Sequence, residues 1–288
     1  MKKIDYLPQF KGFGIADADF NQLIKEELPV LTLGPKDFGI APEKKTALIG
    51  VLFGREEDNY CLAEDYVHSL INAGAKIMFL DYKYHLHQLA LCDGLLLPGG
   101  RFALPEWYFS DAKDVEEDYP SDRARAYAEC FRYALNAKIP VLGICAGMQV
   151  IAAESGLKLF RSSAYFESPL AHNSDEFPAH HVDIVGNTPF RDLMDGSWRI
   201  AVNSRHNEFL APLRIQRELL NLKPNQKLPL EIYAYATDGI PEAIGDMENG
   251  ILGVQWHPEN LATKGHEVQQ RIFNWLVVEA LFAKNKDD

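Results

Sequence analysis

The stretch Val141-Leu142-Gly143-Ile144-Cys145-Ala146-Gly147 decides the fold of this chain. Its first four residues form an apolar run, which is typical of a strand buried on both faces, and a helical run follows up to Ser155. A strand that turns sharply into a helix, with a glycine two positions to either side of the turn residue, is a nucleophile elbow. Here sulfur takes the place of the usual serine oxygen. The stretch therefore predicts an α/β fold with Cys145 at the turn.

A thiol at such a turn has two chemical advantages. The positive end of the helix dipole favours thiolate over thiol, and the backbone N–H of Ala146 is free to bind an oxyanion. The alternative interpretation of Cys145 is a buried structural cysteine. The other three cysteines, Cys61, Cys92 and Cys130, stand singly in amphipathic helical contexts, so core packing is favoured for them. None of the four forms the CxxC pair of a zinc knuckle or redox motif.

Apolar strands alternate with helices on both sides of this stretch. Apolar runs that predict buried strands lie at residues 47–53, 76–80, 94–97 and 139–144. Between these runs, apolar residues recur at helical spacing at residues 62–71, 85–91 and 121–135, which predicts helices there. Further short strands are predicted at residues 181–185, 231–237, 243–247 and 251–256, and a final helix at 266–283. Such alternation predicts a wound parallel sheet with ligands at the carboxyl ends of its strands.

Length and charge narrow the class of protein. The chain has 288 residues, and its 29 basic against 41 acidic residues give a net charge of −12. An acidic surface repels phosphate backbones and anionic membranes, so we expect neither nucleic acid nor membrane as a partner. The N-terminus lacks the apolar core of a signal peptide, which predicts a cytoplasmic location. Glycines and prolines break the pattern before residue 46. We therefore predict an N-terminal extension of uncertain structure (1–45) and a catalytic domain (46–288).

A second motif near the C-terminus supplies a candidate base. His257 follows a predicted buried strand, and Glu259 stands two residues further on, across Pro258. Thiolate chemistry on an amide needs a base that takes the thiol proton and returns it to the leaving nitrogen, and a carboxylate fixes the tautomer of that base. The alternative is a turn with a surface histidine.

The remaining histidines give no metal site on sequence grounds. His180 and His181 are adjacent in a predicted strand and point to opposite faces, which suits a metal poorly, so a structural or pocket-lining role is favoured. His85, His87 and His172 have no companion cluster in the sequence. We therefore expect no metal and no cofactor.

The two motifs together resemble the class I glutamine amidotransferase superfamily, and most closely its γ-glutamyl hydrolase branch. That branch, of peptidase C26 type, includes γ-glutamyl-γ-aminobutyrate hydrolase. The resemblance rests on residues 142–149 and 253–259, supported by Leu97-Pro98-Gly99-Gly100, residues 202–206 and residues 238–243. It implies a mixed, mainly parallel central sheet flanked by helices, in a flavodoxin-like three-layer arrangement.

The resemblance also implies a role for each matching residue. Cys145 would be the nucleophile, His257 the base and Glu259 its orienter. The backbone N–H groups of Gly100 and Ala146 would form the oxyanion hole. The implied substrate-binding residues, with His206 near the pocket rim, are Gly99, Gln149, Asn203, Ser204 and His206.

Three departures from the γ-glutamyl-γ-aminobutyrate hydrolase pattern fall around the expected pocket. An arginine usually follows the nucleophile, where this chain has Ala146. A small residue and an aspartate usually follow Pro-Gly-Gly, where this chain has Arg101-Phe102-Ala103. The usual His-x-Gln is His206-Asn207-Glu208. The chemistry is therefore better determined by the sequence than the substrate is.

The sequence thus predicts a cysteine-dependent hydrolase that cleaves the γ-glutamyl amide bond of a small compound through a glutamyl thioester. One alternative is a glutaminase subunit that supplies ammonia to a separate synthetase partner, and another is a non-catalytic binding protein on the same fold. The sequence leaves open whether the chain forms a homodimer. The loop at residues 101–120, with its aromatic and acidic side chains, is interpreted either as a pocket border that selects the amine side or as a solvated surface loop.

Overall fold

The computed structural model describes residues 3–5, 32–33, 46–56, 59–112, 116, 118–161, 170, 172–174, 176–223 and 225–284. Of these, residues 3–5, 32–33, 54–56, 59–61 and 284 are described by their backbone only. Most of the predicted N-terminal extension therefore lies outside the described residues. Its two described pieces pair with the rest of the chain: β1 (Lys3–Asp5) with β5 (Asn59–Ala63), and β2 (Thr32–Leu33) with β6 (Lys76–Leu80). The domain boundary at residue 45 stays a prediction.

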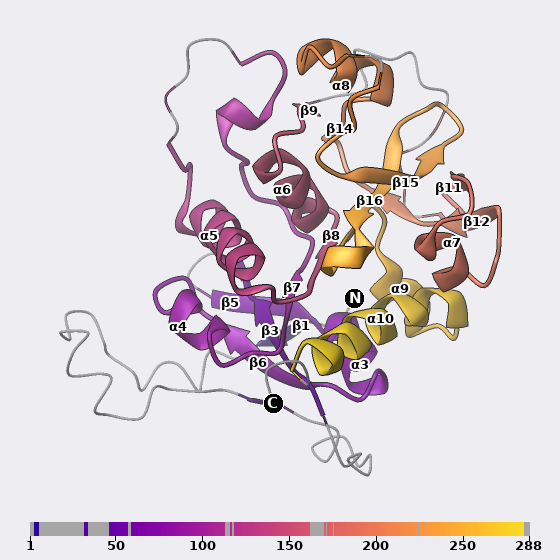
Figure 1. Ribbon diagram of the computed structural model, residues 1–288. Coiled ribbons are helices and arrows are strands. Elements are labelled where there is room, and N and C mark those ends of the chain that lie inside the picture. Colours follow the sequence, from indigo (N-terminus) through magenta and orange to yellow (C-terminus); the bar gives the residue numbers. More distant parts are fainter. Residues whose placement is uncertain are drawn as a thin grey trace.

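A ten-stranded mixed sheet forms the centre of the molecule (Figure 1). Its order is β12 (Arg199–Val202), β11 (His180–Ile184), β15 (Glu231–Ala236), β16 (Pro241–Asp246), β17 (Ile251–Val254), β8 (Val141–Ile144), β7 (Gly94–Leu97), β3 (Leu48–Leu52), β6 and β2. The run from β17 to β6 is parallel, and the flanking strands are antiparallel. The predicted α/β class, with a mixed sheet that is parallel at its centre, is confirmed.

Helices cover both faces of this sheet (Figure 1). One face carries α3 (Glu64–Asn72), α9 (Pro258–Ala262) and α10 (Glu267–Lys284), with α7 (Pro189–Leu193) beside α10. The other face carries α4 (His85–Leu89), α5 (Asp122–Ala137) and α6 (Ala146–Glu154). Parallel strands buried on both faces need apolar side chains at successive positions. In β7, Leu96 joins one core while Leu95 and Leu97 join the other.

Short pairs of strands complete the fold. β4 (Gly54–Glu56) and β5 form a hairpin before α3, so residues 62 and 63, predicted as helical, end a strand instead. β9 (Leu159–Phe160) pairs with β14 (Phe209–Leu210), and β10 (Asn173–Ser174) pairs with β13 (Ser204–Arg205). The other elements are α8 (Leu213–Leu219) and the 3₁₀ turns η2 (Glu106–Tyr108) and η4 (Met247–Asn249). In the described part of the chain, no helix is both long and apolar enough to cross a membrane.

The loop after β7 is anchored by its aromatic residues. Tyr108 and Phe109 are buried, and the Tyr108 hydroxyl donates a hydrogen bond to the Glu154 carboxylate at the end of α6. Trp107 packs edge-on against Tyr108 and Tyr119. Of the acidic residues, Glu116 and Asp118 are exposed, whereas Asp114 and Glu117 lie outside the described residues. Selection of the amine side by this loop stays a prediction.

Candidate active site

Cys145 stands at the turn between β8 and α6, as the elbow pattern predicts. Its backbone has φ +53° and ψ −108°, a conformation that non-glycine residues rarely adopt and that is held only where the surroundings enforce it. The Cys145 N–H donates to the Val254 carbonyl at 2.8 Å, and the Cys145 carbonyl accepts from Gln149 N–H at 3.1 Å. These two bonds hold the turn between its strand and its helix.

The two glycines of the elbow are required by close packing. A Cβ added at Gly147 would lie 2.0 Å from the Leu97 carbonyl oxygen. A Cβ at Gly143 would lie 2.5 Å from Ile151 Cδ1 and 2.7 Å from the Gly147 carbonyl carbon. Side chains at these positions would push α6 away from β7 and β8, so the glycines let the helix start directly behind the nucleophile.

His257 approaches Cys145 because their strands are parallel neighbours. β8 and β17 pair in register, with Ile144 opposite Val254, so both chains leave the sheet at the same edge. The Cβ of Cys145 and Cε1 of His257 both border Gly99, and Cys145 is among the groups that raise the pKa of the His257 imidazole. Residues far apart in sequence therefore meet at the carboxyl ends of adjacent parallel strands.

Glu259 lies in the first turn of α9 and bonds the ring of His257. The His257 Nδ1 to Glu259 Oε1 distance is 2.7 Å, and the Glu259 side chain is fully buried. Burial lowers the pKa of His257, but the Glu259 carboxylate and the Cys145 thiolate raise it more, to well above its ordinary value. An imidazole whose pKa is raised by a thiolate and a carboxylate is suited to form an imidazolium–thiolate pair.

The Gly99–Gly100 turn closes the site on the β7 side. Gly99 N–H donates to the Tyr66 hydroxyl at 2.9 Å, and that hydroxyl lies 3.4 Å from His257 Nδ1. A Cβ at Gly99 would lie 2.7 Å from His257 Cε1. Gly100 has φ +153°, and a Cβ there would lie 2.3 Å from an Arg123 guanidinium nitrogen. Both glycines are therefore needed for this close approach.

Tyr66 and Arg123 were missed as site residues by sequence reasoning. Arg123, buried in α5, donates through Nη2 to the Gly99 carbonyl at 3.2 Å and to the Tyr127 hydroxyl at 3.0 Å. Its guanidinium lies 4.3 Å from the centre of the Phe102 ring. It thus places a positive charge beside the turn. Arg123 lies near the start of a capped helix, and no sequence motif around it indicates a role in the site.

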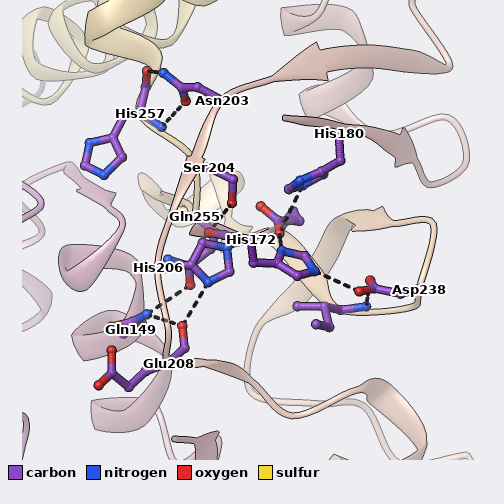
Figure 2. A network of polar contacts seen from close by, with 12 residues as sticks. Gln149, His172, His180, Asn203, Ser204, His206, Glu208, Asp238, Gln255 and His257 are labelled. Atoms are coloured by element: carbon purple, nitrogen blue, oxygen red, sulfur yellow. Dashed lines mark hydrogen bonds and ion pairs between the residues drawn. The ribbon is translucent and has the colours of Figure 1, made fainter. Parts of the chain in front are cut away.

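The predicted substrate-binding side chains are engaged with the protein itself. The Asn203 amide donates to the His257 carbonyl at 2.9 Å and accepts from His257 N–H at 2.8 Å (Figure 2). The Ser204 hydroxyl is buried and donates to the His172 carbonyl at 2.8 Å. The Gln149 amide donates to the Glu208 carbonyl at 2.7 Å. Contact of these residues with substrate stays a prediction, whereas Asn203 clearly positions His257.

Two expectations about histidines are corrected. His206 does not stand at a rim: its ring is buried, and Nδ1 lies 3.0 Å from the Glu208 carbonyl. His172 does have companions, because His180 and His206 pack against its ring (Figure 2). The Glu242 carboxylate lies 3.4–3.5 Å from a nitrogen of each ring. Sequence reasoning missed this cluster because its members come from separate segments of the chain.

The remaining described cysteines contrast with Cys145. Burial is the main cause that raises the pKa of Cys92 to about 12, and it raises the pKa of Cys130 well above its ordinary value. Both thiols lie in the core between α4, α5 and the sheet. They are therefore protonated and unreactive near neutral pH, in keeping with the core packing that the sequence favours. The side chain of Cys61 lies outside the described residues.

The chain is similar in sequence to several known proteins. A sequence model of the peptidase C26 family matches residues 44–259. A putative glutamine amidotransferase-like protein of Lactococcus lactis is 27% identical over 175 residues, which cover 59% of this chain and 67% of the relative. γ-Glutamyl-γ-aminobutyrate hydrolase of Escherichia coli is 26% identical over 212 residues, which cover 69% of this chain and 78% of the relative.

A solved structure shares the fold at lower sequence identity. A putative GMP synthase component from Thermoplasma acidophilum superposes with a TM-score of 0.57 and 16% identity. The superposition covers 85% of this chain and all of the other. At that identity the likeness concerns the fold alone.

Proposed function

Because the chain belongs to the peptidase C26 family, we propose that it hydrolyses the γ-glutamyl amide bond of a small compound through a glutamyl thioester on Cys145. The observation that carries the proposal is the convergence of the Cys145 thiol, the His257 ring and the buried Glu259 carboxylate at one sheet edge. The identities of 26–27% with named relatives support the chemistry more strongly than the substrate.

In the first half of the reaction, His257 takes the proton of the Cys145 thiol, and the sulfur attacks the γ-carbonyl carbon. The oxygen becomes an oxyanion that the backbone N–H groups of Gly100 and Ala146 bind. The carbon–nitrogen bond then breaks, and His257 returns the proton to the leaving amine. A glutamyl thioester remains on Cys145.

The second half repeats these steps with water. His257 removes a proton from a water molecule as the oxygen attacks the thioester carbonyl, and the second tetrahedral intermediate uses the same two N–H groups. The carbon–sulfur bond breaks, the thiol is restored and glutamate is released. Throughout, Glu259 stabilises the imidazolium form of His257, and Asn203 fixes the backbone from which the ring projects.

The ammonia-supplying alternative uses the same site. Its support is that the Lactococcus lactis relative is named glutamine amidotransferase-like and that the Thermoplasma acidophilum structure is named as part of a GMP synthase. Glutamine carries a γ-glutamyl amide, so the first half-reaction would release ammonia instead of a larger amine. Under that alternative a separate synthetase would be the partner.

The test is a substrate panel with the full-length chain. γ-Glutamyl amines, γ-glutamyl peptides, poly-γ-glutamates and glutamine are each incubated with the protein, and glutamate release is measured. We expect steady turnover of a γ-glutamyl amine or peptide without any partner. Glutaminase activity that appears only with an added synthetase would favour the alternative. Mass spectrometry after treatment with a glutamine-analogue alkylator should place the label on Cys145, and an unlabelled Cys145 would refute both.

A further inference from the structure

Three buried imidazoles and one buried carboxylate meet away from the Cys145 site. They belong to His172, His180 in β11, His206 and Glu242 in β16, and each residue is at most 8% exposed. The three rings lie together in Figure 2, with His172 at 4.8 Å from His180 and 5.0 Å from His206 between ring centres. The proposed hydrolysis uses none of these four side chains.

The distances within the cluster are too long for good hydrogen bonds. Glu242 Oε1 lies 3.4 Å from His172 Nδ1, 3.4 Å from His180 Nε2 and 3.5 Å from His206 Nε2. An N–H···O bond spans about 2.7–3.2 Å. Those nitrogens and both Glu242 oxygens have no hydrogen-bond partner among the described residues. Buried polar atoms left in this way are costly unless something binds them.

The same distances fit a tetrahedral metal centre. Zinc lies about 2.0–2.2 Å from imidazole nitrogen and carboxylate oxygen, which places neighbouring ligand atoms of a tetrahedron about 3.3–3.6 Å apart. The three Glu242 separations fall at this value. The ligand atoms of His172, His180 and Glu242 also lie within 4.8 Å of one another.

Partners outside the cluster set the tautomers of two rings. Asp238 Oδ2 lies 2.7 Å from His172 Nε2, and a carboxylate can only accept, so Nε2 carries the proton and Nδ1 presents its lone pair to the cluster. The Glu208 carbonyl accepts from His206 Nδ1 at 3.0 Å, which leaves the lone pair on Nε2. Metal-binding histidines usually donate their other N–H to a carboxylate or a carbonyl in this manner.

We propose that His172, His180 and Glu242 bind one divalent transition-metal ion, with zinc as the expected occupant and His206 beside the ligands. The site is buried and shares no side chain with the Cys145 site, so it is structural and takes no part in hydrolysis. This proposal departs from the expectation, drawn from the sequence, that the protein holds no metal. Its sequence signal was weak because no two ligands lie at a spacing used by short zinc motifs.

The ion would tie together the segments that support His257. His206 N–H and the Ser204 hydroxyl both donate to the His172 carbonyl at 2.8 Å. The side chain of Asn203, next to Ser204, bonds both the N–H and the carbonyl of His257. The Glu242 carbonyl accepts from Gln255 N–H at 2.8 Å, two residues before His257. Loss of the ion should therefore lower thermal stability and loosen the His257 segment.

Adjacent histidines in β11 provide a matched pair for the test. His180 is buried in the cluster, whereas His181 points outward and is exposed. The full-length chain, purified without a histidine tag, is loaded with zinc and desalted, and its metal content is measured by mass spectrometry. We expect one zinc per chain in the wild type and in His181→Gln, and loss of zinc with a lower Tm in His180→Gln and Glu242→Gln.

A spectroscopic measurement keeps the proposal testable if those variants fail to fold. Cobalt(II) is titrated into the chelator-stripped Cys145→Ala chain, in which the elbow thiol cannot act as a ligand. Intense visible absorption that saturates at one equivalent and disappears on adding zinc is the expected result. A wild-type chain that retains neither metal after desalting would overturn the proposal, as would equal zinc in His180→Gln and His181→Gln.

Discussion

The Cys145 site and the His172 cluster both combine histidine with carboxylate, and they differ in how close the partners approach. In the Cys145 site, one imidazole bonds one buried carboxylate at 2.7 Å. In the His172 cluster, three imidazoles stand 3.4–3.5 Å from one carboxylate oxygen without bonding it. The first spacing suits transfer and stabilisation of a proton, and the second suits a larger cation between the groups. The same two residue types thus serve different chemistry, and the separation distinguishes them.

The two regions also differ in access. The His257 side chain is 13% exposed, whereas the His180 and His206 side chains are 1% exposed. A catalytic imidazole must meet substrate, and a closed metal site need not meet solvent after folding. The Asn203–His206 segment connects the regions, because it bonds the His257 backbone at one end and lies beside the proposed ligand Glu242 at the other.

Cys145→Ala is expected to have the largest effect on activity and none on the metal cluster. Removing the nucleophile should lower kcat/KM by about 10⁴-fold or more, because oxyanion binding alone gives little turnover. Tm and zinc content should match the wild type. Glutamate release and metal analysis check both. Cys92→Ala is the control, since its buried thiol has a pKa of about 12 and should be dispensable for turnover. Retention of most activity in Cys145→Ala would show that the mechanism is wrong.

Glu259→Gln should lower kcat/KM about 100-fold less than removal of His257 does. Glu259 orients the imidazole, which is a smaller task than the proton transfer that His257 performs. The substitution should also move the pH profile. The pKa of His257 is raised by Glu259, so the imidazolium–thiolate form persists as pH rises and is lost only above the ordinary histidine value. Without that carboxylate the basic limb of kcat/KM should shift to lower pH.

The control for that shift is Glu242→Gln, which removes a buried carboxylate from the other region. Any activity it loses should come with the basic limb unchanged, because Glu242 is not among the groups that raise the pKa of His257. A basic limb that moves in Glu242→Gln and stays fixed in Glu259→Gln would contradict the separation of the two regions.

The parts of the fold that could be predicted are those whose signal is local. Apolar runs marked β3, β6, β7 and β8, and Ser121 marked the start of α5, where its hydroxyl accepts from Ala124 N–H at 3.2 Å. Two-residue strands such as β10 and β13 have no periodicity to detect. Their pairing depends on long-range contacts that no short window of sequence contains.

The candidate site divides in the same way. The Cys145 elbow and the His257–Glu259 motif are each short, so sequence reasoning found the groups that the structure brings together. The His172 cluster was missed for two reasons. Its members are spread from residue 172 to residue 242. The His180–His181 pair was set aside because its side chains point to opposite faces, although the inward-pointing one alone can join residues from other segments. Tyr66 likewise lies 191 residues from the ring that it approaches.

Tyr66→Phe is expected to give the smallest of these effects and to separate positioning from chemistry. Its hydroxyl accepts from Gly99 N–H at 2.9 Å and lies 3.4 Å from His257 Nδ1, so its loss leaves a backbone donor unpaired beside the site. An unsatisfied buried donor costs about 1–3 kcal/mol, and we expect roughly a tenfold fall in kcat with KM little changed. Tyr233→Phe is the matched control, since its hydroxyl accepts from Met247 N–H at 3.1 Å far from Cys145. It should lose similar stability while keeping kcat. Equal kcat in both variants would mean that the Gly99 turn needs no support from Tyr66 to keep its geometry around His257.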